Sequence, residues 1–177
     1  SFLEQCGFIR KYKTIGEVPY LYQLSDSFTL FYFQFLKNGA YSDHETWMHL
    51  LTTSTCTTWR GLAFERLCFA HLQQIKQKLG ISGILTKTCS YYSGQAQVDM
   101  VIDRADRAVT VCEMKFSERP YLITKAEWDK IETRLNEVQN YFKRKTLFFA
   151  MVTSNGLVKN KYSINYVRQE ITLDDLF

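Results

Sequence analysis

The feature that most constrains the fold is an unbroken apolar run over residues 147–152. A strand without polar alternation is typical of a sheet whose two faces are both covered. Earlier parts of the chain can supply the covering layers and the neighbouring strands: a helix over residues 60–79, strands over 84–92, 96–103 and 108–117, and a helix over 124–142. This order of helices and strands predicts an α/β core.

The first 52 residues predict a smaller α+β unit. The expected order is the end of a helix at Gly7, strands over 8–12 and 20–24, a helix over 26–36 that Asn38 and Gly39 stop, and a helix over 45–51. At the other end of the chain, a weak strand is expected over 164–167.

Composition narrows the class of protein. The 177 residues are 46% apolar and 15% aromatic, which provides enough apolar surface for a packed core and excludes a disordered chain. The formal net charge of +4 permits a nucleic-acid partner without requiring one.

The absence of membrane-span and export patterns, together with the cysteine content, indicates where in the cell the protein is expected. No apolar run approaches the ~20 residues that a membrane span needs, and the first residues lack the pattern of a signal peptide. Five cysteines without a Cys-x-x-Cys pair suit a reducing compartment, where Cys68 and Cys112 act as small buried hydrophobes. We therefore expect a cytoplasmic protein without a membrane partner. The absence of an initial Met indicates a piece of a longer protein.

The informative segment covers residues 96–117, where charged residues occur in strands that should be buried. Alternation along the last of these strands puts Glu113 and Lys115 on one face with Val109 and Val111. Asp99 interrupts the apolar pattern of the preceding strand, on the face opposite to Val98 and Met100. Burying such charges costs several kcal/mol unless they are paired or bind a metal ion.

The register of these two strands decides whether their carboxylates meet. A four-residue connection sets Asp99 opposite Cys112, whereas one further residue or a bulge sets Asp99 opposite Glu113. Two carboxylates that face each other across a sheet repel, and a divalent cation between them removes that repulsion.

Glu65 adds a third carboxylate at the border of the apolar stripe of its helix. Three hard oxygen ligands with open water positions suit Mg²⁺ or Mn²⁺ better than zinc. Lys115 lies about 6.5–7 Å from Glu113 along the same strand face. From there it could orient or deprotonate a metal-bound water, or stabilise charge on an attacked phosphate.

These residues resemble the motifs of a known superfamily. The segments Gly61-Leu-Ala-Phe-Glu65, Gln97-Val-Asp99-Met-Val-Ile-Asp103-Arg104 and Cys112-Glu113-Met-Lys115-Phe116 are similar to those of the PD-(D/E)XK, or restriction-endonuclease-like, superfamily. The whole chain also resembles the C-terminal part of a family of prokaryotic AAA+-type ATPases. In that family a winged-helix segment follows the ATPase domain, and a nuclease-like domain ends the chain.

The resemblance implies a restriction-endonuclease-like mixed sheet flanked by helices over residues 53–177. It also implies a small winged-helix remnant with linking helices over residues 1–52. In the nuclease-like domain it assigns metal-binding and catalytic roles to four residues: Asp99 and Glu113 as ligands of Mg²⁺ or Mn²⁺, Lys115 as the catalytic lysine, and Glu65 as a ligand bound directly or through water. Val98 stands where the superfamily has proline.

The same resemblance implies partners. These are DNA and an upstream ATPase domain of the same parent protein, and a homodimer stays open because many nucleases of this fold act as dimers. Lys125 matches a position of the family, where it either contacts a phosphate or caps the turn into the following helix. Arg10, Lys11 and Lys13 lie on a wing-like strand, where they either follow a DNA backbone or form a solvated edge. No P-loop motif occurs, so we expect no ATP site in this chain.

The sequence thus predicts metal-dependent phosphodiester hydrolysis, with a Mg²⁺- or Mn²⁺-dependent deoxyribonuclease as the expected enzyme class. The alternative is a non-catalytic module that binds DNA or regulates its own ATPase. A third explanation treats the acidic cluster as an internal salt bridge of Glu113 with Lys115 or Lys125.

Overall fold

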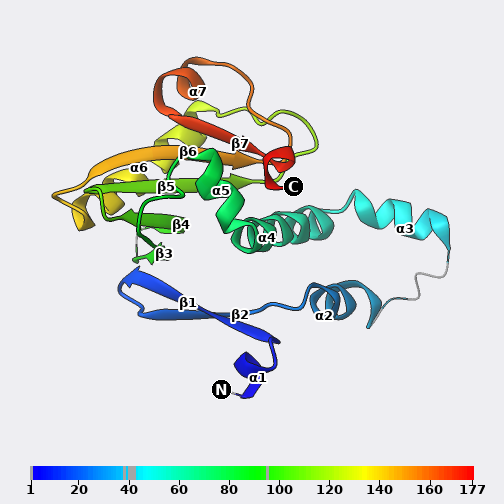
Figure 1. The fold of residues 1–177 in the computed structure, drawn as a ribbon. Coiled ribbons are helices and arrows are strands. Elements are labelled where there is room, and N and C mark those ends of the chain that lie inside the picture. Colours follow the sequence, from blue (N-terminus) through cyan, green and yellow to red (C-terminus); the bar gives the residue numbers. More distant parts are fainter. Residues whose placement is uncertain (1, 38, 40–42, 95) are drawn as a thin grey trace.

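The computed structural model describes residues 2–37, 39, 43–94 and 96–177, so Asn38 lies outside the described residues. Its centre is a seven-stranded sheet in the order β2-β1-β3-β4-β5-β6-β7 (Figure 1). The strands are β1 (Ile9–Gly16), β2 (Tyr20–Leu24), β3 (Thr86–Tyr92), β4 (Gln97–Arg104), β5 (Ala108–Lys115), β6 (Thr146–Thr153) and β7 (Gln169–Thr172). The β1–β3, β5–β6 and β6–β7 pairs are parallel and the other three are antiparallel, so the sheet is mixed.

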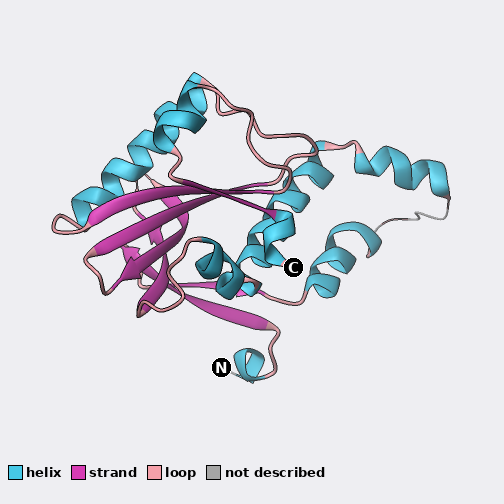
Figure 2. Ribbon diagram, turned by 45° about the horizontal axis from the view of Figure 1, so that its top comes forward, coloured by secondary structure: helices cyan, strands magenta, loops and turns pink. Residues whose placement is uncertain are grey.

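Helices flank this sheet on both sides (Figure 2). They are α1 (Phe2–Gln5), α2 (Ser27–Phe31), the π-helix η1 (Tyr32–Leu36), α3 (His44–Leu51), α4 (Ser54–Ala70), α5 (Leu72–Lys78), α6 (Lys125–Tyr141), α7 (Lys161–Tyr166) and the 3-10 helix η2 (Leu173–Leu176). None of the helices in these ranges combines the length and apolar character that crossing a bilayer requires. The predicted α/β class, with a mixed sheet between helices, is confirmed.

The central strands separate two cores. Cys112 and Met114 of β5 pack with residues of α4 and α5, whereas Val109 and Val111 pack with residues of α6. Because β5 is buried on both faces, the charged residues at its end lie in a region that is largely shielded from solvent. The apolar run over 147–152 forms most of β6, and Cys68 and Cys112 are buried thiols, both as predicted.

Two sequence predictions were wrong about element boundaries. The helix expected over 60–79 begins at Ser54, because the Thr53 side chain accepts a hydrogen bond from the Cys56 amide, and it is divided at His71, whose backbone leaves helical geometry. The strand expected over 164–167 is largely the helix α7, whose first amides donate to the Asn160 side chain. The real strand in this region, β7, comes directly after it.

The N-terminal hairpin belongs to the main sheet. β1 pairs with β3 in parallel, from Thr14 opposite Ser90 to Gly16 opposite Tyr92. The sheet is therefore continuous across the boundary expected at residue 52. At the other end of the chain, an ion pair of 2.6 Å between Lys78 and Asp175 ties η2 to α5.

We expect that residue 16 must be glycine for the β1–β2 hairpin to pair with β3. Its φ of +106° favours glycine, and a Cβ there would lie 2.1 Å from the carbonyl oxygen of Tyr92. We expect Gly16→Ala to lower the free energy of unfolding by about 1–2 kcal/mol, measured by urea denaturation.

Gly61 provides the matched control for this substitution, because it lies inside α4 and a Cβ there meets no other atom within 4 Å. Gly61→Ala is expected to stabilise by about 0.5–1 kcal/mol through helix propensity. Equal effects of the two substitutions would contradict the close approach at Gly16.

Candidate functional site

The register of β4 and β5 brings two of the predicted carboxylates together. Asp103 pairs with Val109 and Met100 pairs with Cys112. Continuing this register by one residue sets Asp99 opposite Glu113, which is the second of the two arrangements that the sequence left open. Both residues lie toward the end of the sheet where β5 terminates (Figure 1).

A bulge in β4 lies between Val98 and Val101, next to Asp99. Cys89 pairs with Val101 and Tyr91 pairs with Val98, so β4 has one residue more than β3 between these two pairs. Val98 and Val101 both join the core beneath α6, whereas Met100 joins the core beneath α4. The strict alternation predicted for β4, which put Val98 and Met100 on one face, is therefore wrong, because a bulge redirects side chains next to the inserted residue.

Glu113 is held by two cations. Its side chain is only 3% exposed, and its Oε1 atom forms an ion pair with Lys115 Nζ at 2.8 Å and accepts a hydrogen bond from Arg134 Nη1 at 2.6 Å. The predicted contact between Glu113 and Lys115 is thus present. Lys125, the other expected partner, is instead exposed at the first residue of α6.

Arg134 is a site residue that the sequence analysis missed. It lies three residues after Ile131 and four before Val138, both of which α6 buries against the sheet. An arginine at helical spacing within an apolar stripe is a usable signal, because its head group must find an anion on the buried side. In this chain that anion is Glu113.

Asp99 and Glu65 are the two carboxyl groups of the site that form no ion pair with a described cation. Burial, followed by the charges of Glu65 and Glu113, raises the pKa of Asp99 from 3.8 to about 7. Burial also raises the pKa of Glu65, and Glu113 adds to the shift. Within the described ranges, neither Asp99 nor Glu65 forms an ion pair, in contrast to Glu113.

Thr153 adds an unsatisfied polar atom beside the site. It pairs with Lys115 in the register of β5 and β6, and it is fully buried. Its Oγ1 atom has no hydrogen-bond partner in the described part of the chain. A buried hydroxyl of this kind requires a partner, which a water molecule or a ligand in the site would supply.

The donor atoms suit Mg²⁺ or Mn²⁺ in type but are not arranged as a ready metal cage. Carboxylate oxygens are the ligands that these ions prefer, and Asp99 lacks a cation of its own. Yet no three His, Cys, Asp or Glu side chains among the described residues are close enough to hold one metal ion. Binding would require Glu113 to exchange a contact with Lys115 or Arg134 for the metal.

The residues predicted to touch DNA do not share one surface. Lys11 and Lys13 lie on the face of β1 that carries Tyr20 and Tyr22 of β2, and Lys11 Nζ is 3.8 Å from the centre of the Tyr20 ring. Arg10 is on the opposite face and lines a cavity toward α4. At Lys125, the helix cap is made by Thr124 and Glu127, so Lys125 does not cap this turn.

Comparisons with known proteins leave the function open. No protein-family model and no curated protein matches the chain. Among solved structures, the chain is similar to the crystal structure of AF1548, a protein of unknown function, with 18% identity and a TM-score of 0.40. The similarity covers 60% of this chain and 56% of that one.

Proposed function

We propose that the chain is a nuclease-like domain that hydrolyses phosphodiesters with a divalent metal ion. The observation that carries this proposal is the position of Asp99 opposite Glu113 in the register of β4 and β5, with Glu65 of α4 near enough that its charge, after burial, adds most to the raised pKa of Asp99. Only Lys115 and Arg134 among the described residues pair with this group, and both bind Glu113. The remaining negative charge on Asp99 and Glu65 favours a cation.

Each residue has a proposed role. Asp99 and Glu113 would hold Mg²⁺ or Mn²⁺, and Glu65 would complete the ligand set directly or through water. The bound ion would supply a nucleophilic water and neutralise charge on the phosphate. Lys115 Nζ, released from Glu113, would orient that water or donate to a phosphate oxygen. Arg134 would hold the Glu113 side chain in place during this exchange.

The finer fold and the partners belong to the same proposal. A restriction-endonuclease-like sheet would present the carboxylates to DNA, and the N-terminal hairpin would be the remnant of a winged helix that joins the chain to an ATPase domain. Lys11 and Lys13 on one face of β1 support a contact with a phosphate backbone. Lys125 would bind a phosphate at the first turn of α6, where amide groups also favour anions.

The test is cleavage of plasmid and oligonucleotide DNA with Mn²⁺. We expect Asp99→Ala to lower the cleavage rate by about 100-fold or more, because it removes one proposed ligand. Asp129→Ala is the matched control, because Asp129 is an exposed carboxylate of α6 that is not one of the proposed metal ligands. Cleavage by Asp99→Ala at the wild-type rate would overturn the assignment.

One observation favours a second candidate function. The contacts of Glu113 with Lys115 and Arg134 neutralise that carboxylate without a metal ion, which is the arrangement of a structural salt bridge. A non-catalytic module that binds DNA or regulates its ATPase would need nothing more. In that case Mn²⁺ would leave the melting temperature unchanged, whereas a metal site raises it by mass action.

A further inference from the structure

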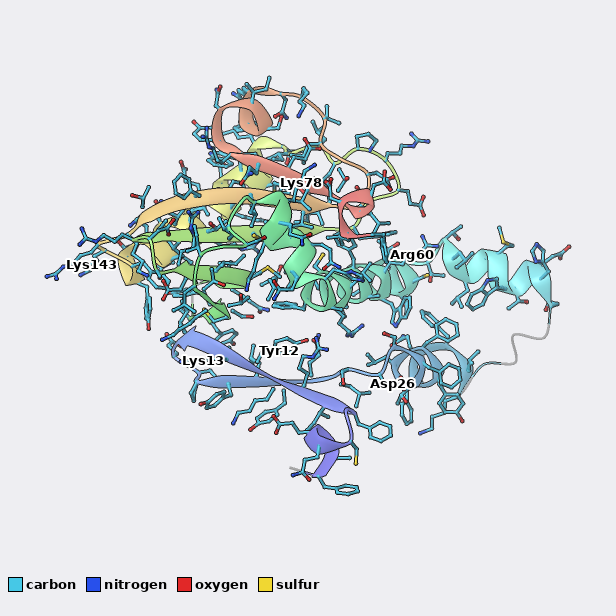
Figure 3. The ribbon with its side chains drawn as sticks, in the orientation of Figure 1. Tyr12, Lys13, Asp26, Arg60, Lys78 and Lys143 are labelled. Atoms are coloured by element: carbon cyan, nitrogen blue, oxygen red, sulfur yellow. The ribbon has the colours of Figure 1, made fainter. Side chains whose placement is uncertain are left out.

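A cavity of about 410 Å³ lies between the β1–β2 hairpin and α4. Figure 3 shows Tyr12 on the hairpin side of this space, and Arg60 belongs to α4. The cavity has two kinds of lining side chain that matter for recognition: aromatic rings (Tyr12, Trp59, Phe64, Phe116) and arginines (Arg10, Arg60, Arg66). Its volume is within the range of small-molecule sites.

The charge of this cavity is one-sided. Among the described residues that line it, none is acidic. Arg60 binds Glu118 at 2.6 Å, but Arg10 and Arg66 have no carboxylate partner within the ranges that the structure describes. The Nε atom of Arg66 is buried without a hydrogen-bond acceptor. A buried guanidinium donor without an acceptor is costly, and an anion in the cavity would remove that cost.

The walls of the cavity suit a flat apolar group. Phe64 is buried at its base, and the Tyr12 ring is fixed against Phe69 with 4.9 Å between ring centres. The Nε1 atom of Trp59 is a second buried donor without a partner among the described residues. Rings held in this way offer surfaces for stacking, and the unpaired donors fix the orientation of a polar end.

We propose that this cavity binds a small organic anion, with a flat apolar body against the aromatic residues and a carboxylate or phosphate at Arg10 and Arg66. This site is separate from the carboxylate cluster, because none of the cluster residues lines the cavity. The proposal therefore stands or falls independently of the hydrolytic function.

The probe for the test is 8-anilinonaphthalene-1-sulfonate, which combines an aromatic body with one anionic group. Fluorescence titration of the whole chain is expected to show saturable binding with one site. Arg66→Gln should raise the dissociation constant of this probe by about tenfold, and Arg10→Gln, at an exposed position of β1, by about threefold. Both substitutions should have much smaller effects on the uncharged N-phenyl-1-naphthylamine.

Controls separate this site from other apolar surfaces. Ala63→Trp should abolish binding of both probes, because the new ring occupies the cavity that Ala63 lines. Arg144→Gln, an exposed arginine outside the cavity, should change neither dissociation constant. Unchanged binding of the sulfonate by both Arg66→Gln and Arg10→Gln would overturn the proposal. If Arg66→Gln does not fold, Arg10→Gln alone decides, because a substitution at this exposed position should not disturb folding.

Competition identifies the anionic group. Displacement of the probe by 1-naphthoate, by 1-naphthyl phosphate or by both is expected, and the tighter competitor shows whether the natural ligand presents a carboxylate or a phosphate. Uncharged 1-naphthol should compete about tenfold more weakly. Equal competition by 1-naphthol would contradict recognition by the arginines.

Discussion

Asp99→Asn is expected to stabilise the protein at pH 8 by about 2–4 kcal/mol, because the wild-type protein must ionise a carboxyl group whose pKa the fold raises to about 7. Asn keeps the size of the side chain and removes the charge. The measurement is urea denaturation of both proteins, without metal ions, between pH 4 and pH 8.

The sign of the pH dependence follows from proton binding. Between pH 3.8, the ordinary pKa, and about 7, the folded state holds the Asp99 proton more often than the unfolded state does. This contribution to stability is therefore present at low pH and is lost as the pH rises through 7. The advantage of Asp99→Asn should vanish near pH 4 and become constant above pH 8.

Asp129→Asn supplies the control for this series, because Asp129 is exposed on α6. Its effect should stay within about 0.5 kcal/mol at every pH, as for most surface substitutions. A wild-type protein that is more stable than Asp99→Asn at pH 8 without metal ions would contradict the crowding of carboxylates at this site.

Arg134→Met is expected to destabilise the protein by about 2–3 kcal/mol at pH 8. It removes one of the two cations of Glu113, whose side chain is 3% exposed, while Lys115 keeps part of the compensation. Met retains the apolar stem that packs along α6, so the loss reports mainly on the charge. The measurement is again the free energy of unfolding in urea.

Glu113→Gln should largely rescue this loss. In the double variant residue 113 no longer carries a buried charge that needs Arg134, so the effect of Arg134→Met on the Glu113→Gln background should fall below about 1 kcal/mol. Arg144→Met, at an exposed position, is the matched control and should change stability little. Equal effects of Arg134→Met in both backgrounds would show that Arg134 does not stabilise the protein through its contact with Glu113.

The central sheet could be predicted from the sequence because its strands are strongly patterned. The run over 147–152 and the apolar positions of β5 identified strands covered on both faces. The division of the long helix at His71 was not predicted, since a local departure of the backbone leaves no break in the apolar spacing. The short helix α7 was missed because its cap at Asn160 outweighs the apolar residues that suggested a strand.

The candidate site was predictable in its residues but not in its contacts. Glu113 and Lys115 could be placed together because both lie on one face of one strand. The bulge that separates Val98 and Met100 onto different faces depends on the register with β3, which no local pattern in β4 specifies. The contact of Arg134 with Glu113 depends on how α6 packs across the sheet, and this packing is a tertiary property.

The most direct test of the proposed metal site is a calorimetric Mn²⁺ titration at pH 8 of the wild type and of Glu113→Gln, with and without a nuclease-resistant phosphorothioate oligonucleotide. The account predicts saturable binding to the wild type, weaker binding at pH 6 where Asp99 holds a proton, and loss of binding in Glu113→Gln. Absence of Mn²⁺ binding to the wild type at pH 8, both with and without the oligonucleotide, would contradict a metal-dependent site in this chain.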